Sequence, residues 1–184
     1  MEIKDKKAKF IITVVWILFT RTYDAICTYR LTPDLSKESN PLVSVFGMGW
    51  FPLILTIGLL SIYIIYCYYL SMFKPKDLSP EEKGFSFGNF IAYIYLGWKD
   101  SWTAMFYKFP KDINRFNQFV GKIFTRCLVF VGFISTIMWI LINNSAFYRK
   151  IHSVLLVDGT ILLGCFLIIY IWNRIIYKKY ITSR

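Results

Sequence analysis

Residues 50–73 have the sequence WFPLILTIGLLSIYIIYCYYLSMF, in which no side chain is charged. A helix of about 20 apolar residues is long enough to cross the hydrocarbon core of a bilayer, so this stretch predicts a transmembrane helix. Residues 10–29, 119–142 and 153–175 have the same apolar character. The sequence therefore predicts an all-α polytopic membrane protein, in which residues 1–184 form a single membrane domain around a bundle of four transmembrane helices.

The composition excludes several other classes of protein. Only 18% of the residues are charged, whereas 56% are apolar, and soluble domains carry about a quarter charged residues. These values exclude a soluble enzyme and an intrinsically disordered chain. The four cysteines lie in different apolar runs and His152 is the only histidine, so the pattern matches neither a disulfide framework nor a zinc site. We expect no cofactor.

The uncharged stretch that contains the second span begins earlier, at Pro41, and is longer than one crossing requires. Gly47 and Gly49 interrupt it, which predicts a short surface helix followed by the span itself. Asn40 is a favourable N-cap and Pro41 a favourable first residue for that short helix.

The segment between the second and third spans, residues 74–118, is basic at both ends and aromatic in the middle. Its apolar core, residues 85–98, is followed by the charged residues Lys99 and Asp100. This core is too short to cross the bilayer, because a transmembrane helix needs about 20 apolar residues. We expect an interfacial or a re-entrant element, and the sequence leaves these two alternatives open.

The distribution of lysine and arginine predicts the orientation. Of the 22 basic residues, 16 lie in the N-terminal segment, in residues 74–122 and at the C-terminus, whereas 4 lie in the two opposite loops. Because cytoplasmic loops are enriched in lysine and arginine, both termini are expected in the cytoplasm of a multi-pass protein of the cell membrane.

A charged side chain inside a predicted span is costly and is a functional candidate by default, and three such residues stand out. They are Arg21 and Asp24 in the first span and Asp158 in the fourth. Arg21, Asp24 and Thr28 share one face of a helix because they are spaced by three and four residues. One interpretation is that Arg21 and Asp24 simply neutralise each other within the first span.

A second interpretation is a polar pocket that opens to the outside. Glu38 and Asn40 follow the first span closely enough to fold back over its outer end, and Asp158 enters the fourth span at a similar depth. Asp24, Glu38 and Asp158 would then offer oxygen ligands without imidazole or thiolate. Such a set suits a hard metal cation or a cationic head group, with Arg21 as the internal counter-charge.

The pattern Asp24-x-x-x-Thr28, followed by Glu38-x-Asn40-Pro41, resembles a signature of small uncharacterised prokaryotic multi-span membrane proteins. In these proteins a D-x-x-x-T…E-x-N-P motif joins the first two spans. The resemblance covers residues 21–41 and supplies no activity, but it implies that Asp24, Glu38, Asn40 and Pro41 belong together. It does not extend to the aromatic, basic segment 74–118.

Three functions fit these features. The first is a binding, transport or channel component with an outward-facing acidic pocket. The second is a non-catalytic membrane anchor or assembly subunit, and the third, which the motifs favour less, is an intramembrane lipid-modifying enzyme. Expected partners are the lipid bilayer, anionic lipid at the basic cytoplasmic face, and either a second copy or another membrane subunit. Nucleic acid is not expected, because no recognition motif accompanies the basic and aromatic residues.

The predicted orientation can be tested by cysteine accessibility. A cysteine that replaces Lys37 or Lys150 should react with an impermeant maleimide in intact cells. One that replaces Lys83 or Lys178 should react only after the membrane is permeabilised. Labelling of position 178 from outside would overturn the four-span topology.

Overall fold

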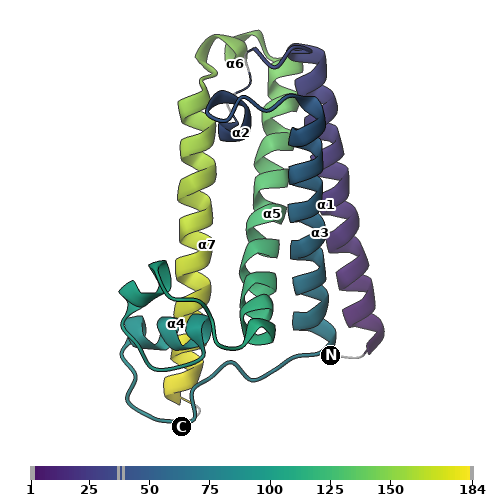
Figure 1. Ribbon diagram of the computed structural model, residues 1–184. Helices are drawn as coiled ribbons and strands as arrows, with labels where there is room; N and C mark the ends of the chain where they lie inside the picture. The colour runs from purple at the N-terminus through teal and green to yellow at the C-terminus, as the bar shows by residue number, and fades with distance from the viewer. Residues whose placement is uncertain (1–2, 37, 39, 183–184) are drawn as a thin grey trace. The chain divides into compact units, whose positions relative to one another are not determined.

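The computed structural model describes residues 3–36, 38 and 40–182. Its helices fall into two length classes (Figure 1). The long helices are α1 (Ile3–Leu31), α3 (Trp50–Phe73), α5 (Ile113–Asn144) and α7 (Val154–Thr182). The short ones are α2 (Pro41–Ser44), α4 (Phe87–Leu96), α6 (Ala146–Ile151) and the 3-10 helix η1 (Trp102–Phe106). No strand occurs in the part of the chain that the structure describes. The four long helices are long and apolar enough to cross a membrane, which confirms the predicted fold class.

Three of the long helices extend beyond the predicted spans. The helix α5 begins at Ile113 rather than at residue 119, and α7 continues to Thr182 rather than ending at 175. With a rise of about 1.5 Å per residue, the 32 residues of α5 measure roughly 48 Å, more than the about 30 Å of a hydrocarbon core. Apolarity marks the part of a helix that lies in lipid, and the polar ends continue the helix into the interface.

The contacts between residues divide the chain into two compact units. The first unit comprises residues 1–63 and 127–165, and the second comprises residues 64–126 and 166–184. The helices α3, α5 and α7 contribute residues to both units.

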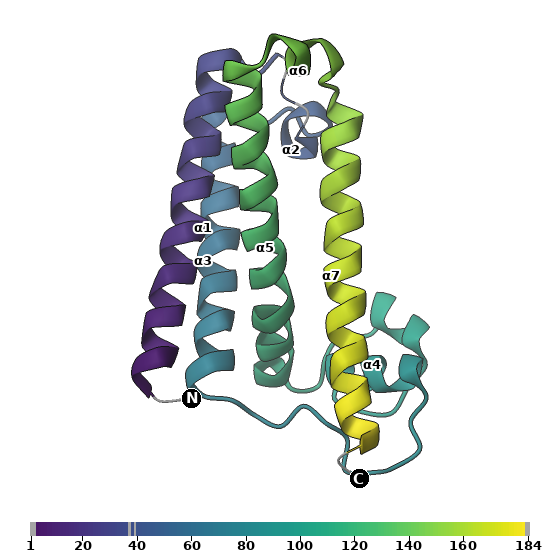
Figure 2. The ribbon, with the colours of Figure 1, turned by 180° about the vertical axis from the view of Figure 1, so that it is seen from behind.

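In the first unit, α1 packs closely against α5 (Figure 2). Gly132 of α5 permits this approach, since a Cβ atom at this position would overlap the Thr20 side chain of α1. One turn away, the Trp16 indole N–H donates to the carbonyl of Val129 at 3.3 Å, and the Trp16 ring contacts Phe133 at 6.2 Å between ring centroids. Small residues at a helix interface are typical of membrane proteins, where close packing replaces the hydrophobic effect.

The start of α2 forms as the sequence predicts. The Asn40 side chain accepts a hydrogen bond from the Leu42 N–H at 3.0 Å, and Pro41 is the first residue of α2. The α2 helix ends at Ser44 and the second span begins at Trp50, so the division near Gly49 is confirmed. The Trp50 indole N–H donates to the Pro33 carbonyl at 2.7 Å and so attaches this loop to the start of α3.

In the second unit, α4 packs against the C-terminal part of α7 (Figure 1). Phe90 of α4 is fully buried and contacts the rings of Tyr177 and Tyr180. The hydroxyl groups of these two tyrosines donate to the carbonyls of Phe85 and Glu82, so they hold the segment that precedes α4. The 10 residues of α4 measure roughly 15 Å, so the helix does not cross a bilayer, as the sequence predicts.

Asp100 fixes the turn that follows α4. Its carboxylate accepts hydrogen bonds from the Lys108 ammonium at 2.7 Å, the Ser101 N–H at 2.8 Å and the Trp98 indole at 3.1 Å. The Lys108 bond, followed by those from Ser101 and Trp98, holds the pKa of Asp100 below its ordinary value. The chain between α4 and η1 is therefore an ordered turn, and its charges pair locally.

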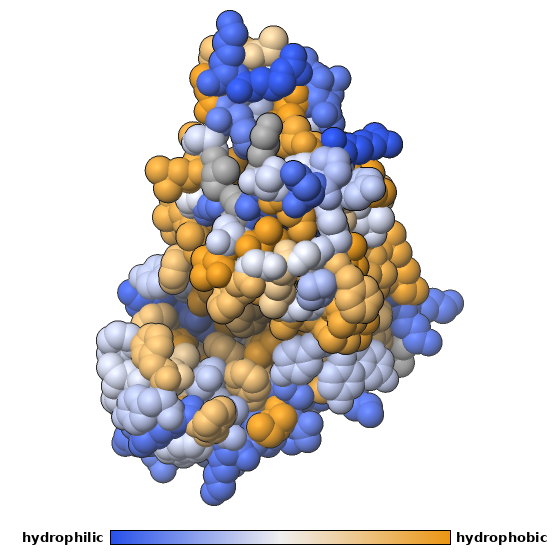
Figure 3. Space-filling view, turned by 45° about the horizontal axis from the view of Figure 1, so that its top comes forward, coloured by the Kyte–Doolittle hydropathy of each residue, from blue (hydrophilic) through white to orange (hydrophobic). Residues whose placement is uncertain are grey.

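Large apolar side chains cover the outside of the long helices. Orange, hydrophobic residues occupy broad areas of the face in Figure 3, and the strongly hydrophilic residues gather toward its margins. On α3, Leu59 and Ile62 are 59% and 62% exposed, and on α7 Leu162 and Leu163 are 59% and 63% exposed. Exposed apolar surface on this scale is what lipid-facing helices present.

The contact between α3 and α5 in the second unit gives a packing test. A Cβ atom at Gly121 would overlap the backbone carbonyl of Cys67 and lie 2.6 Å from the Tyr68 nitrogen, and backbone atoms cannot rotate away. Replacing Gly121 with alanine should lower the free energy of unfolding by about 1–3 kcal/mol through overpacking. Gly58 is the matched control, because its Cβ would meet nothing within 4 Å. Gly58→Ala should be neutral or slightly stabilising in the same detergent titration, and equal losses for both variants would contradict the packing described.

Candidate functional site

Two charged residues lie deep in the first span. Lys9 and Arg30 flank the apolar part of α1 and lie roughly 32 Å apart along the helix axis, close to the about 30 Å thickness of a hydrocarbon core. By the same measure, Arg21 and Asp24 lie roughly 18 and 22 Å from Lys9. Both residues are therefore expected in the hydrocarbon region, with Asp24 nearer to the loop that leads to α2.

Two side chains of α5 bind the Asp24 carboxylate. The Ser135 hydroxyl donates to Oδ1 at 3.0 Å, and the Trp139 indole N–H donates to the same oxygen at 2.7 Å. Ser135 and Trp139 are four residues apart, so they share one face of α5, and both are buried. This arrangement supplies the carboxylate with two donors in a region where lipid supplies none.

The Arg21 guanidinium is less well satisfied. Its Nη1 lies 4.0 Å from the second Asp24 oxygen, Oδ2, which is a long ion pair. Its Nε and Nη2 atoms are buried and have no hydrogen-bond acceptor among the described residues. A buried donor without an acceptor costs about 1–3 kcal/mol. Arg21, Asp24, Ser135 and Trp139 form what we call the Asp24 cluster, in which Oδ1 of Asp24 has two donors and two Arg21 donors lack an acceptor.

The other residues of the predicted pocket have local roles or lie elsewhere. Thr28 is buried one turn beyond Asp24, and its carbonyl accepts from the Thr32 N–H at 2.8 Å. The Glu38 carboxylate accepts from the Asn40 N–H at 2.8 Å, while the Asn40 side chain caps α2. Both polar groups of the E-x-N-P sequence therefore take part in the turn that starts α2.

Asp158 lies on the exposed side of α7 and forms no ion pair with another described residue. Asp158 and Arg174 are separated by roughly 24 Å along the axis of α7. With Arg174 at one boundary of the hydrocarbon core, Asp158 is therefore near the opposite boundary. Water and head groups can hydrate a carboxylate at that depth. Within residues 3–36, 38 and 40–182, no three His, Cys, Asp or Glu side chains are grouped so that they could hold a metal ion, so Asp24, Glu38 and Asp158 do not converge there.

Comparisons with protein-family models, with curated proteins and with solved structures find no match to this chain. The residues of the Asp24 cluster therefore carry the functional argument by themselves.

Two of the tryptophan hydrogen bonds in the first unit differ in the charge of their acceptor. Trp139 donates to a carboxylate, whereas Trp50 donates to a neutral carbonyl, each at 2.7 Å. Bonds to charged groups contribute about 1.5–3 kcal/mol and neutral ones about 0.5–1.5 kcal/mol, although values inside membranes are often smaller. Trp139→Phe should therefore lower the free energy of unfolding more than Trp50→Phe does. Equal losses would show that the Asp24 carboxylate does not hold the indole.

Proposed function

We propose that this chain is a small multi-pass component of the cell membrane, with both termini in the cytoplasm, that binds an anionic group at Arg21 as part of a transport or channel process. The basic residues at the N-terminus, in segment 74–118 and at the C-terminus support the orientation. The observation that carries the proposal is the pair of buried Arg21 donors that lack an acceptor.

The charges of the Asp24 cluster favour an anionic ligand over a cation. Asp24 accepts two hydrogen bonds at Oδ1, and its Oδ2 faces Arg21, so a metal or an ammonium group bound there would lie beside the like charge of the guanidinium. Arg21 balances the charge of Asp24 but retains donors in a planar fork, which suits a carboxylate or a phosphate. The binding group in this proposal is therefore Arg21, held by Asp24, rather than three converging carboxylates.

The exposure of the pair is consistent with a ligand that approaches from the side of Asp24. The Asp24 side chain is 33% exposed and the Arg21 side chain 20% exposed. A guanidinium group without hydrogen-bond acceptors at this depth lowers the stability of the protein. Buried charged groups that lower stability in this way commonly serve a function.

The alternative function, a non-catalytic anchor or assembly subunit, uses the same chemistry. In that case the missing acceptor is a carboxylate on a helix of a partner subunit rather than on a small ligand. Both functions require Arg21. The isolated protein binds a small anionic ligand if the first function is right, whereas an assembly subunit binds a partner helix instead.

The proposal can be tested with a carboxylate amphiphile. The buried thiols of Cys27, Cys67 and Cys127 should react with a maleimide dye only on unfolding, which reports the melting temperature of the protein in phosphatidylcholine nanodiscs. Oleate should raise the melting temperature of the wild type by several degrees at concentrations well above its Kd, whereas methyl oleate should not. Arg21→Gln should abolish the shift, which is measured against the melting temperature of each variant without ligand, since the substitution also removes the counter-charge of Asp24.

Arg30→Gln is the matched control, since it removes an arginine from the same helix outside the Asp24 cluster, and it should keep the oleate shift. If oleate shifts no variant, but the protein in its native membrane migrates as a larger complex that Arg21→Gln alone dissociates, the assembly function is supported. If Arg21→Gln responds to oleate as the wild type does, or if neither effect depends on Arg21, the proposal is wrong.

A further inference from the structure

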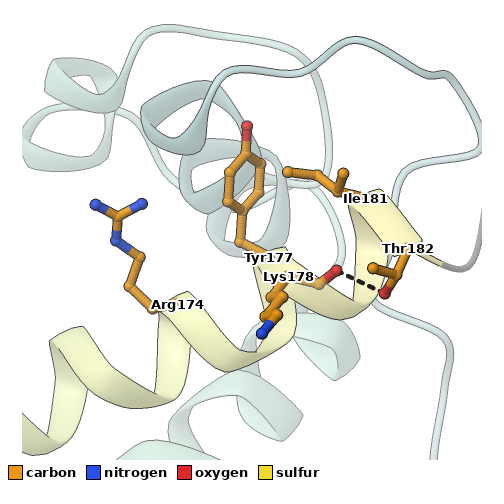
Figure 4. A pocket seen from close by; sticks show the side chains of 5 residues that line it. All are labelled: Arg174, Tyr177, Lys178, Ile181 and Thr182. Carbon is orange, nitrogen blue, oxygen red and sulfur yellow. Dashed lines mark hydrogen bonds between the residues drawn. The ribbon is translucent and has the colours of Figure 1, made fainter.

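The last turns of α7 carry a second basic site, which lies outside the Asp24 cluster. Here an open depression of about 450 Å³ is lined by side chains of a single helix segment (Figure 4). The lining residues are Arg174, Tyr177, Lys178, Ile181 and Thr182. The depression therefore combines two cationic side chains with an aromatic ring and an aliphatic side chain.

Aromatic neighbours hold the Arg174 guanidinium in place. Its Nε donates to the Tyr170 hydroxyl at 2.9 Å, and its carbon Cζ lies 4.8 Å from the centroid of the Phe87 ring of α4. This contact positions the guanidinium through cation–π attraction while its terminal nitrogens remain available. No described acidic side chain forms an ion pair with Arg174.

Lys178 extends the same positive surface. It follows Arg174 by four residues, so the two side chains lie on one face of the helix, and it too has no ion-pair partner among the described residues. Residues 166–184 contain no aspartate or glutamate. The end of α7 therefore carries positive charge that nothing in its own sequence neutralises.

Apolar groups adjoin these charges. The Tyr177 hydroxyl donates to the Phe85 carbonyl, so the side chain presents its ring rather than its polar end to the depression. Ile181 is 58% exposed beside it. Toward the middle of α7, Leu167 and Tyr170 are each 50% exposed and share the face of Arg174 by helical spacing. A basic end thus continues into an apolar strip along a membrane-spanning helix.

We propose that this surface binds one anionic phospholipid, with the phosphate on Arg174 and Lys178 and an acyl chain along Leu167 and Tyr170. The guanidinium fork and the ammonium group match a phosphate diester, and basic residues at a membrane surface attract anionic lipid. The apolar strip distinguishes a lipid from a soluble phosphate, because only the lipid has a chain to bury there. The site is independent of Arg21 and does not rest on the function proposed above.

Native mass spectrometry of the full chain in detergent tests the site. Phosphatidylglycerol should bind the wild type more tightly than phosphatidylcholine does. The double variant Arg174→Gln/Lys178→Gln should weaken phosphatidylglycerol binding roughly 30-fold, given the usual contribution of two basic residues near a membrane surface. Lys7→Gln/Lys9→Gln is the matched control, because it removes the same charge from exposed positions of α1 and should keep the wild-type affinity.

Two further measurements separate binding from folding and lipid from free phosphate. Arg174→Lys keeps the charge but loses the fork, so its affinity should fall between those of the wild type and the double variant, with unchanged circular dichroism. Inorganic phosphate at millimolar concentration should not displace the lipid. Equal weakening in both double variants would overturn the proposal, as would displacement by inorganic phosphate.

Discussion

A charged side chain in the hydrocarbon core of a bilayer finds no water, so the protein itself must supply its hydrogen-bond partners. Asp24 meets this requirement through Ser135 and Trp139, which reach it from a neighbouring helix. The interaction needs α1 and α5 to approach closely, and Gly132 permits this approach beside Thr20. Helix packing and the polar cluster therefore depend on each other, since a wider separation would leave the carboxylate without donors.

The sequence predicts the spans well because hydrocarbon selects for uninterrupted apolar runs, and residues 50–73 form such a run. It also predicts the start of α2, because the capping role of Asn40 and the place of Pro41 are local and depend on a few neighbouring atoms. The ends of α5 and α7 are less predictable from apolarity. Backbone hydrogen bonding continues into the interface after the apolar pattern has stopped, as it does from Ile175 to Thr182.

The candidate site is only half predictable for a related reason. Arg21 and Asp24 stand out because their charges are rare at that depth, but their partners are a serine and a tryptophan, which are common in spans. The only signal for Ser135 and Trp139 is their spacing of four residues, and many pairs share it. Glu38 and Asp158 draw attention by the same charge criterion, yet Glu38 serves its own turn and Asp158 is exposed on α7. Charge identifies which residues need a partner, whereas only tertiary structure identifies the partner.

In the two proposals, the depth of Arg21 and of Arg174 in the membrane determines which anionic group each guanidinium binds. Both guanidinium groups keep donors that no described carboxylate satisfies closely. Arg21 lies 4.0 Å from Asp24, and Tyr170 and Phe87 hold Arg174 in place. Arg21 lies within the span, where phosphates of the bilayer do not reach, so the acceptor that we propose for it belongs to a ligand or to another helix. Arg174 lies near the end of α7, where lipid phosphates are abundant and an apolar strip adjoins the charge. The two proposals therefore assign the same type of side chain to a specific binding site at one level and to a lipid site at the other.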